Sequence, residues 1–254
     1  MKDSLEANKE IMFIDKISKK FGGIVADNQV SFKLYLGKIH GLIGPNGSGK
    51  STTLNLISGI HEADGGSISL DGKVITNLST YVRARMGIAR SFQTPRLLKR
   101  CDIKTNIFLG MDLAKRKKLK SNVSLQDNAR LEELMEIAGF KENMSDSIEK
   151  LSYGKQKLLE IVRAILTKPK ILLLDEPAAG LNHKEMEKVI GLINIAVKEN
   201  TAVLLVEHSM ELVMSLCDSI TVLNFGCVIA QGAPKEIQSN PVVIEAYIGS
   251  EKNA

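Results

Sequence analysis

The octapeptide GPNGSGKS, residues 44–51, decides the fold class of this 254-residue chain. It fits the pattern G-x-x-x-x-G-K-[ST], in which the backbone N–H groups of a glycine-rich turn surround phosphate oxygens. The pattern requires a buried strand before it and a helix after it. Both are expected, because residues 38–44 are largely apolar and Leu54 and Ile57 have helical spacing. We therefore predict a phosphate-binding loop between a buried strand and a helix.

The residue types of the loop suit a nucleotide. Glycines let the backbone turn its N–H groups inward, and the following helix adds its dipole. Lys50 would reach the β- and γ-phosphates, and the Ser51 hydroxyl would be a ligand of Mg²⁺. The nucleotide-binding residues expected in and after the loop are Gly44, Pro45, Asn46, Gly47, Ser48, Gly49, Lys50, Ser51 and Thr52.

A second motif narrows the choice among nucleotide-binding proteins. ILLLDEP, residues 171–177, is an apolar strand that ends in two carboxylates. Asp175 would hold Mg²⁺, usually through water, and Glu176 would polarise a water for in-line attack on the γ-phosphate. Such a pair alone is more often an ordinary surface turn. Together with the upstream loop it predicts an ATP- or GTP-hydrolysing site.

Hydrophobic patterning predicts an α/β fold built around this loop. Residues 30–36 alternate, and residues 67–75 contain Asp71-Gly72 between two β-like runs, which is typical of a hairpin. These features predict an N-terminal antiparallel β subdomain. Residues 171–174 and 202–206 read as buried parallel strands of the loop-containing core, whose sheet is mainly parallel.

The segments between and after these strands have other patterns. Leu131, Leu134, Met135 and Ala138 have helical spacing, as do Leu158, Ile161, Val162 and Ile165, so residues 94–167 predict an inserted α-helical subdomain. Two further short strands are expected within residues 218–232, and a helix near 242–248.

Composition excludes several classes of protein. Three cysteines without a CxxC pair argue against a disulfide framework or a zinc site. No apolar run approaches the roughly 18 residues of a membrane span, and the first residues contain no apolar core of a secretory signal. The net charge of +5 permits an anionic partner but selects none.

LSYGKQ, residues 151–156, resembles the LSGGQ signature of ATP-binding cassette (ABC) proteins. The residues agree physically, since Ser152 is a good helix N-cap and Gly154 permits close backbone approach. The resemblance implies that Ser152 and Gly154 contact the γ-phosphate of the nucleotide held by the other subunit. Tyr153 replaces one of the two signature glycines and Lys155 replaces a glutamine, and their effects stay open.

Four more positions match the family pattern. Gln93, at the end of ARSFQ, resembles the Q-loop glutamine, which senses Mg²⁺ and the attacking water. Asn182 resembles the D-loop position that is more often Asp, and His208 resembles the switch histidine. Phe21, in KFGG, resembles the aromatic residue that stacks on adenine; the alternative is a core phenylalanine in an N-terminal strand.

The resemblance covers residues 11–249 and implies one ABC ATPase domain in the chain. Within it, residues 11–93 and 168–249 form the catalytic core with the antiparallel subdomain, and residues 94–167 form the helical subdomain. DEPAAG, which begins at Asp175, and the tail NPVVIEAYIG, which begins at Asn240, place the chain nearest to the ATPases of branched-chain amino acid importers.

Membership of that group implies an enzyme that hydrolyses ATP, with Mg²⁺, to drive uptake of branched-chain or hydrophobic amino acids. The working unit would be a dimer of identical or related ATPase chains that closes on two ATP. Separate membrane-embedded permease subunits would dock at Gln93 and the helical subdomain, and an external binding protein would act indirectly. We therefore expect a peripheral location on the cytoplasmic face of the plasma (inner) membrane, and no nucleic-acid partner.

Two alternatives stay open. The same motifs would serve an exporter of lipid or lipopolysaccharide. A soluble ABC ATPase that acts on nucleic acid would use the positive charge, but such proteins usually carry two cassettes or long coiled-coil inserts. The sequence does not fix the transported substrate, the identity of the second ATPase chain or the role of the basic cluster Lys115–Lys120.

Overall fold

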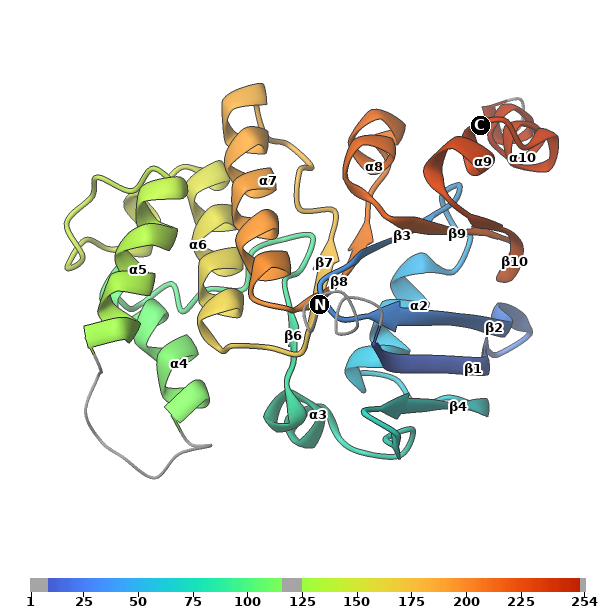
Figure 1. Cartoon of the computed structure of the whole chain (residues 1–254), viewed down its shortest axis with the longest axis horizontal. Coiled ribbons are helices and arrows are strands. Elements are labelled where there is room, and N and C mark those ends of the chain that lie inside the picture. Colours follow the sequence, from blue (N-terminus) through green and yellow to red (C-terminus); the bar gives the residue numbers. More distant parts are fainter. Residues whose placement is uncertain (1–8, 116–124, 252–254) are drawn as a thin grey trace, which may run out of the picture.

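The computed structural model describes residues 9–115 and 125–251, which form two β-sheets and the helices around them (Figure 1). The antiparallel sheet lies at one end of the molecule, and helices α4, α5 and α6 lie at the other. The basic cluster Lys115–Lys120 falls outside the described residues apart from its first member. None of the described helices is long and apolar enough to span a bilayer.

The larger sheet has six strands in the order β10-β9-β3-β8-β7-β6, all parallel except β10, which runs antiparallel to β9. Every residue of β3, β7 and β8 is buried, which explains their continuous apolar sequences. The strands are β3 (Ile39–Ile43), β6 (Ile88–Arg90), β7 (Ile171–Asp175), β8 (Ala202–Val206), β9 (Ser219–Asn224) and β10 (Cys227–Gly232). The predicted α/β fold with a mainly parallel sheet is confirmed.

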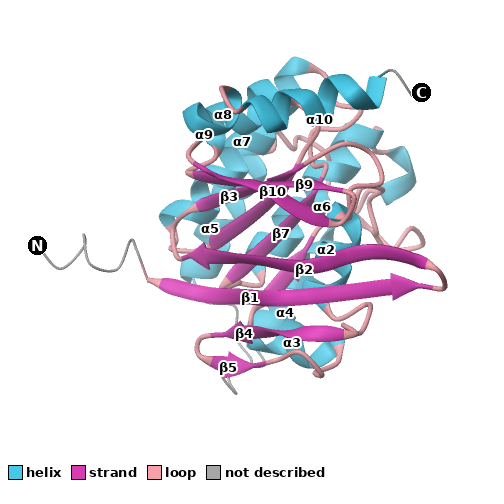
Figure 2. Ribbon diagram, turned by 90° about the vertical axis from the view of Figure 1, so that its right-hand side faces the viewer, coloured by secondary structure: helices cyan, strands magenta, loops and turns pink. Residues whose placement is uncertain are grey.

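The smaller sheet is antiparallel, with the order β2-β1-β4-β5. Figure 2 shows its two long strands, β1 (Glu10–Phe21) and β2 (Ile24–Tyr35), side by side. The predicted hairpin at Asp71-Gly72 joins β4 (Gly65–Leu70) to β5 (Lys73–Val74). β2 begins six residues before the predicted alternating run, because pairing with β1 extends it through residues 24–29.

Helices cover the six-stranded sheet and form the inserted segment. α2 follows the phosphate loop, and α4, α5 and α6 make up the predicted helical region. The helices are α2 (Lys50–Ser58), α3 (Thr80–Met86), α4 (Ile103–Lys115), α5 (Leu125–Ile137), α6 (Tyr153–Leu166), α7 (His183–Lys198), α8 (Met210–Leu216), α9 (Pro234–Gln238) and α10 (Pro241–Glu251), with a 3-10 turn at Ile148–Lys150.

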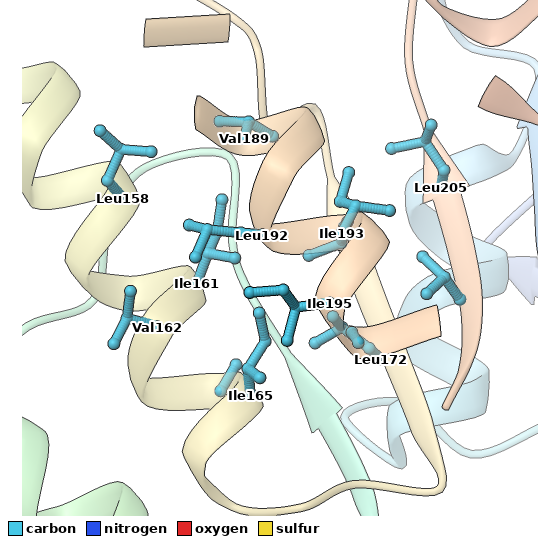
Figure 3. Close-up of a cluster of buried hydrophobic side chains, with 14 of the residues drawn as sticks. Leu158, Ile161, Val162, Ile165, Leu172, Val189, Leu192, Ile193, Ile195 and Leu205 are labelled. Atoms are coloured by element: carbon cyan, nitrogen blue, oxygen red, sulfur yellow. The ribbon is translucent and has the colours of Figure 1, made fainter. Parts of the chain in front are cut away.

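The main core joins α6 to the parallel sheet. Leu158, Ile161, Val162 and Ile165, the positions predicted to form one helical face, are fully or almost fully buried. They belong to one cluster with Leu192 on α7 and residues of β7 and β8, and Figure 3 shows α6 and α7 facing each other across it. Each buried leucine or isoleucine of this kind stabilises the fold by about 1.5–3 kcal/mol. This packing fixes α6, and with it the residues at its N-terminus, relative to the strand that carries Asp175.

Candidate functional site

The phosphate loop runs from the end of β3 to the start of α2, as predicted. Gly44 and Gly49 have φ values of 151° and 107°, in a region that other residues rarely adopt. A Cβ atom on Gly44 would lie 2.1 Å from the carbonyl oxygen of Leu223, and one on Gly49 would lie 2.4 Å from Oδ1 of Asp27. Neighbouring backbone and side chains therefore leave room only for glycine at both positions.

The Lys50 ammonium lies over this loop. Its Nζ donates hydrogen bonds of 2.8 Å to the carbonyl oxygens of Gly44 and Pro45. Burial lowers the pKa of Lys50, while the carboxylates of Glu176 and Asp175 oppose that effect. The cation is thus held where phosphates cradled by the loop would meet it.

The three predicted catalytic residues meet at one carboxylate. Glu176 Oε2 accepts a 2.8 Å hydrogen bond from Nε2 of Gln93, and its Oε1 lies 2.5 Å from Nε2 of His208. These residues follow three different strands, β7, β6 and β8, whose carboxyl ends share one edge of the sheet. Glu176 also has a positive φ of 48°, which is uncommon for a non-glycine residue and typical of functional sites.

Asp175, at the end of β7, is held by an arginine that the sequence motifs did not single out. Nη2 of Arg90 donates to Oδ2 of Asp175 at 2.9 Å. Nη1 of the same guanidinium donates to Oδ1 of Asn55 at 2.7 Å and to Oγ of Ser58 at 2.9 Å. Arg90 therefore links the second motif to α2, the helix that follows the phosphate loop. Its place three residues before Gln93 was visible in the sequence, but its burial was not.

The predicted metal ligands Ser51, Gln93 and Asp175 offer hydroxyl, amide and carboxylate oxygens, the ligands that Mg²⁺ prefers. Within residues 9–115 and 125–251, no cluster of three or more His, Cys, Asp or Glu side chains is arranged to hold a metal ion. This donor set fits Mg²⁺ bound together with nucleotide phosphates and water, which is its usual mode at phosphate sites.

The signature segment begins α6 as predicted. Ser152 is the N-cap, and its Oγ accepts a hydrogen bond from the Lys155 backbone nitrogen at 3.3 Å. The hydroxyl of Tyr153 donates to the carbonyl oxygen of Gln93 at 3.0 Å, and its ring lies against Gly180. The Lys155 side chain turns away to pair with Glu142. The two residues that depart from the signature pattern thus make separate contacts. Tyr153 connects the signature to the Gln93 segment, and Lys155 pairs with Glu142.

Three further charged residues of α6 were missed by the sequence reasoning. Glu160 accepts hydrogen bonds from the backbone nitrogens of Phe92 at 3.1 Å and Arg96 at 2.8 Å. Lys157 Nζ donates to the carbonyl oxygens of Glu176 and Ala179, and Arg163 donates to the Arg96 carbonyl at 2.6 Å. Burial raises the pKa of Glu160 and lowers that of Lys157. The helical spacing of Tyr153, Lys157 and Glu160 was the signal that could have revealed this polar face.

Two predicted residues lie at the margin of the site. Asn182 is the N-cap of α7 and forms a capping box with Glu185, which is the contact the structure shows for it. Phe21 ends β1 with 43% of its surface exposed, and its ring lies edge-to-face with His61 at 5.2 Å. The alternative of a core phenylalanine is therefore wrong, and stacking on adenine stays a prediction.

Comparisons with known proteins agree with this geometry. A family profile described as "ABC transporter" matches residues 28–179, and one described as "Branched-chain amino acid ATP-binding cassette transporter" matches residues 227–253. The chain is 36% identical to the high-affinity branched-chain amino acid transport ATP-binding protein BraF of Pseudomonas aeruginosa, over 95% of this chain and 99% of that protein. It is 37% identical to LivG of Escherichia coli K12, a protein with the same description, over the same shares of the two chains.

Solved structures show the same similarity. The ADP conformation of an ATP-binding cassette of an ABC transporter superposes with a TM-score of 0.81 at 31% identity, covering 95% of this chain and 99% of that chain. A nucleotide-free ATP-binding cassette from an ABC transporter gives the same TM-score and identity, with 95% and 100% covered.

Proposed function

The chain belongs to the ABC transporter family and is an ATPase of that family, and we propose that it powers an importer of branched-chain or other hydrophobic amino acids. The observation that carries the coupling to ATP hydrolysis is the meeting of Gln93 and His208 on the carboxylate of Glu176, beside the Lys50 loop. The amino acid specificity is supported by the match of residues 227–253 to the branched-chain profile and by the names of the two relatives.

Hydrolysis follows from the placement of these groups. Glu176 would accept a proton from, and orient, the water that attacks the γ-phosphate, and Gln93 and His208 would fix the direction of its carboxylate. The Lys50 ammonium and the N-terminus of α2 would offset charge on the phosphates. Ser51, Asp175 and Gln93 would hold Mg²⁺, which when bound neutralises phosphate charge.

A second ATPase chain is part of the proposal. Ser152 is exposed, and Tyr153 beside it is 44% exposed, so the N-terminus of α6 faces outward. Phosphates bind well at such helix ends. A partner of the same or a related sequence would present its nucleotide to this end, and would in turn cover the nucleotide on the Lys50 loop. Two ATP would then lie between two chains.

A permease subunit would dock next to the Gln93 segment. A cavity of about 350 Å³ lies between α3 and β6 on one side and α4 and α6 on the other. Exposed apolar side chains, Tyr81 at 59% and Leu109 at 41%, stand at its edge, and the charged side chains of Glu160 and Arg163 line it. Glu160 also accepts a hydrogen bond from the backbone of Phe92, next to Gln93. A subunit that displaces the residues lining this cavity would therefore also displace Gln93 and the Glu176 carboxylate that it contacts. Such docking would place the chain at the cytoplasmic face of the membrane.

Replacing Glu176 with glutamine tests the proposed site. We expect ATP turnover to fall by a factor of about 100 or more, since the amide cannot accept the proton of the attacking water. ATP binding should persist, and ATP should convert the variant from monomer to dimer in light scattering. Glu62→Gln, an exposed acidic residue in the α2–β4 loop, is the matched control and should hydrolyse ATP at the wild-type rate.

Two results would contradict the proposal. Undiminished turnover by the Glu176 variant would remove this residue from the catalytic site, and a variant that stays monomeric with ATP would refute the closed dimer. Import is tested separately, by pull-down from mildly solubilised native membranes followed by uptake of labelled leucine. Recovery of nucleic-acid-associated proteins without a membrane-embedded chain would overturn the importer assignment.

A further inference from the structure

A buried carboxylate lies directly behind the phosphate loop. Asp27, on β2, has no exposed surface, and its Oδ2 accepts a 3.0 Å hydrogen bond from the hydroxyl of Thr53 on α2. Its Oδ1 has no hydrogen-bond partner among the described residues. This oxygen is the atom that a Cβ on Gly49 would meet at 2.4 Å. An acidic side chain from the antiparallel sheet therefore occupies the space behind a glycine of the loop.

Backbone hydrogen bonds hold this carboxylate against the loop. The nitrogen of Asn28, the next residue, donates to the carbonyl oxygen of Gly226 at 2.8 Å, and the Gly226 nitrogen donates to the Ser48 carbonyl at 3.0 Å. On the other side, the Thr53 nitrogen donates to the Gly49 carbonyl at 2.8 Å. Strand β2, the β9–β10 turn, the loop and α2 are thus joined around Asp27. The carboxylate of Asp27 is therefore held next to the backbone of Gly49.

No cation is arranged to neutralise Asp27 among the described residues. Three ionisable groups on the elements around it adjoin Asp27 or its contacts: Lys19, its partner in the register of β1 and β2, Lys50 at the start of α2, and Cys227 on β10, which contacts Asn28. Lys19 Nζ pairs with Asp64 at 2.8 Å, Lys50 Nζ binds loop carbonyls, and the Cys227 sulfur accepts from the Asn28 amide. Burial raises the pKa of Asp27 to about 7, and the Thr53 hydrogen bond opposes this only in part.

Nucleotide phosphates would further favour the protonated form of Asp27. They would bring negative charge to the outer side of the loop while Asp27 lies on its inner side. Two like charges separated by a few atoms in a poorly solvated region repel each other. Protonation at Asp27 removes the repulsion and gives the unpartnered Oδ1 a hydrogen atom to donate. The bound state therefore favours the neutral carboxyl group.

We propose that Asp27 is a positioning residue of the phosphate loop and that nucleotide binding is accompanied by uptake of one proton from solvent at its carboxyl group. The inference rests on the proposed nucleotide site and adds a dependence on pH that the site's motifs do not contain. By reciprocal linkage, a nucleotide that favours the protonated form binds more tightly at lower pH.

The test compares wild type with Asp27→Asn, which keeps the shape of the side chain but cannot ionise. Binding of Mg·ADP, which is not hydrolysed, is measured by calorimetry from pH 6 to pH 9. We expect wild-type affinity to fall roughly tenfold more than that of the variant across this range, which corresponds to about 1.4 kcal/mol. Titration of the nucleotide itself is common to both proteins and cancels in the comparison.

A second measurement and a control complete the test. At pH 7.5, the wild-type binding enthalpy should vary with the ionisation enthalpy of the buffer, because a proton is taken up, and this dependence should be weaker in Asp27→Asn. Glu62→Gln should keep the wild-type pH profile. Equal pH profiles for wild type and Asp27→Asn would overturn the proposal. So would a folded Asp27→Asn that binds no nucleotide at any pH, since the ionised form would then be required.

The nucleotide site and the proposed proton uptake at Asp27 are tested by different results. If wild type binds no Mg·ADP at any pH, the nucleotide site and the proposed function fail. If wild type binds but takes up no proton, only the role of Asp27 fails. Should Asp27→Asn not fold, a wild-type binding enthalpy that does not vary with the buffer would still overturn the proposal, because that measurement needs no variant.

Discussion

The two flanks of the phosphate loop each contribute a buried aspartate, and the structure treats the two residues differently. Asp175, from the parallel sheet, is 7% exposed and pairs with Arg90. Asp27, from the antiparallel sheet, is fully buried with one hydroxyl donor and no cation. Burial without a cation disfavours the ionised form of a carboxylate and makes it sensitive to protonation. The parallel sheet thus supplies an ion pair, and the antiparallel sheet supplies a carboxylate whose charge pH can change.

Replacing Arg90 with methionine would remove the difference between the two aspartates, because Asp175 would then lack a paired cation, as Asp27 does. We expect the free energy of unfolding to fall by about 3–5 kcal/mol, the cost of breaking a buried ion pair from one side. Asn55 and Ser58 would also lose a donor. Urea unfolding at pH 7.5 measures the effect.

Arg90→Lys is the matched control for charge. A lysine keeps the cation but cannot reach Asp175, Asn55 and Ser58 together, because it lacks the planar fork of a guanidinium. We expect it to recover a substantial part of the lost stability. If the methionine and lysine variants unfold at the same urea concentration, the charge of Arg90 is not what stabilises this flank.

The second prediction concerns stability at the other flank. The pKa of Asp27 is about 7 in the folded chain, against an ordinary value of 3.8. The folded state therefore keeps its proton to higher pH than the unfolded state does. The contribution of Asp27 is fully present below pH 3.8 and is lost as pH rises to about 7.

Asp27→Asn does not titrate and should escape this loss. Its stability relative to wild type should improve between pH 5 and pH 8 by as much as about 3 kcal/mol. Guanidinium unfolding of both proteins at the two pH values measures the change. A difference between variant and wild type that is the same at both pH values would mean that Asp27 ionises as readily in the folded chain as in the unfolded one.

The contrast also shows how far the sequence alone can lead. The loop at Gly44, the strand before Asp175 and the helix after Ser152 were predicted because each has a local pattern of glycines, apolar runs or capping residues. Arg90 and Asp27 carry no such pattern. Their roles arise from packing between elements distant in sequence, since β2 meets the loop through the β9–β10 turn and β6 meets α2. Local periodicity predicts which face of an element is buried, but not which atom lies opposite.

The smallest expected effect on stability concerns the single hydrogen bond between Thr53 and Asp27. Thr53→Val removes the hydroxyl that donates to Asp27 and keeps the volume of the side chain. This hydrogen bond lowers the pKa of Asp27, so its loss should raise that pKa from its value of about 7. The cost should be small at pH 5, where Asp27 is neutral, and about 1 kcal/mol larger at pH 8, where the ionised form has lost its donor. Equal costs at both pH values in thermal unfolding would show that the hydroxyl does not distinguish the two forms. In the double variant Thr53→Val/Asp27→Asn this pH dependence should vanish, because no ionising group remains at the site.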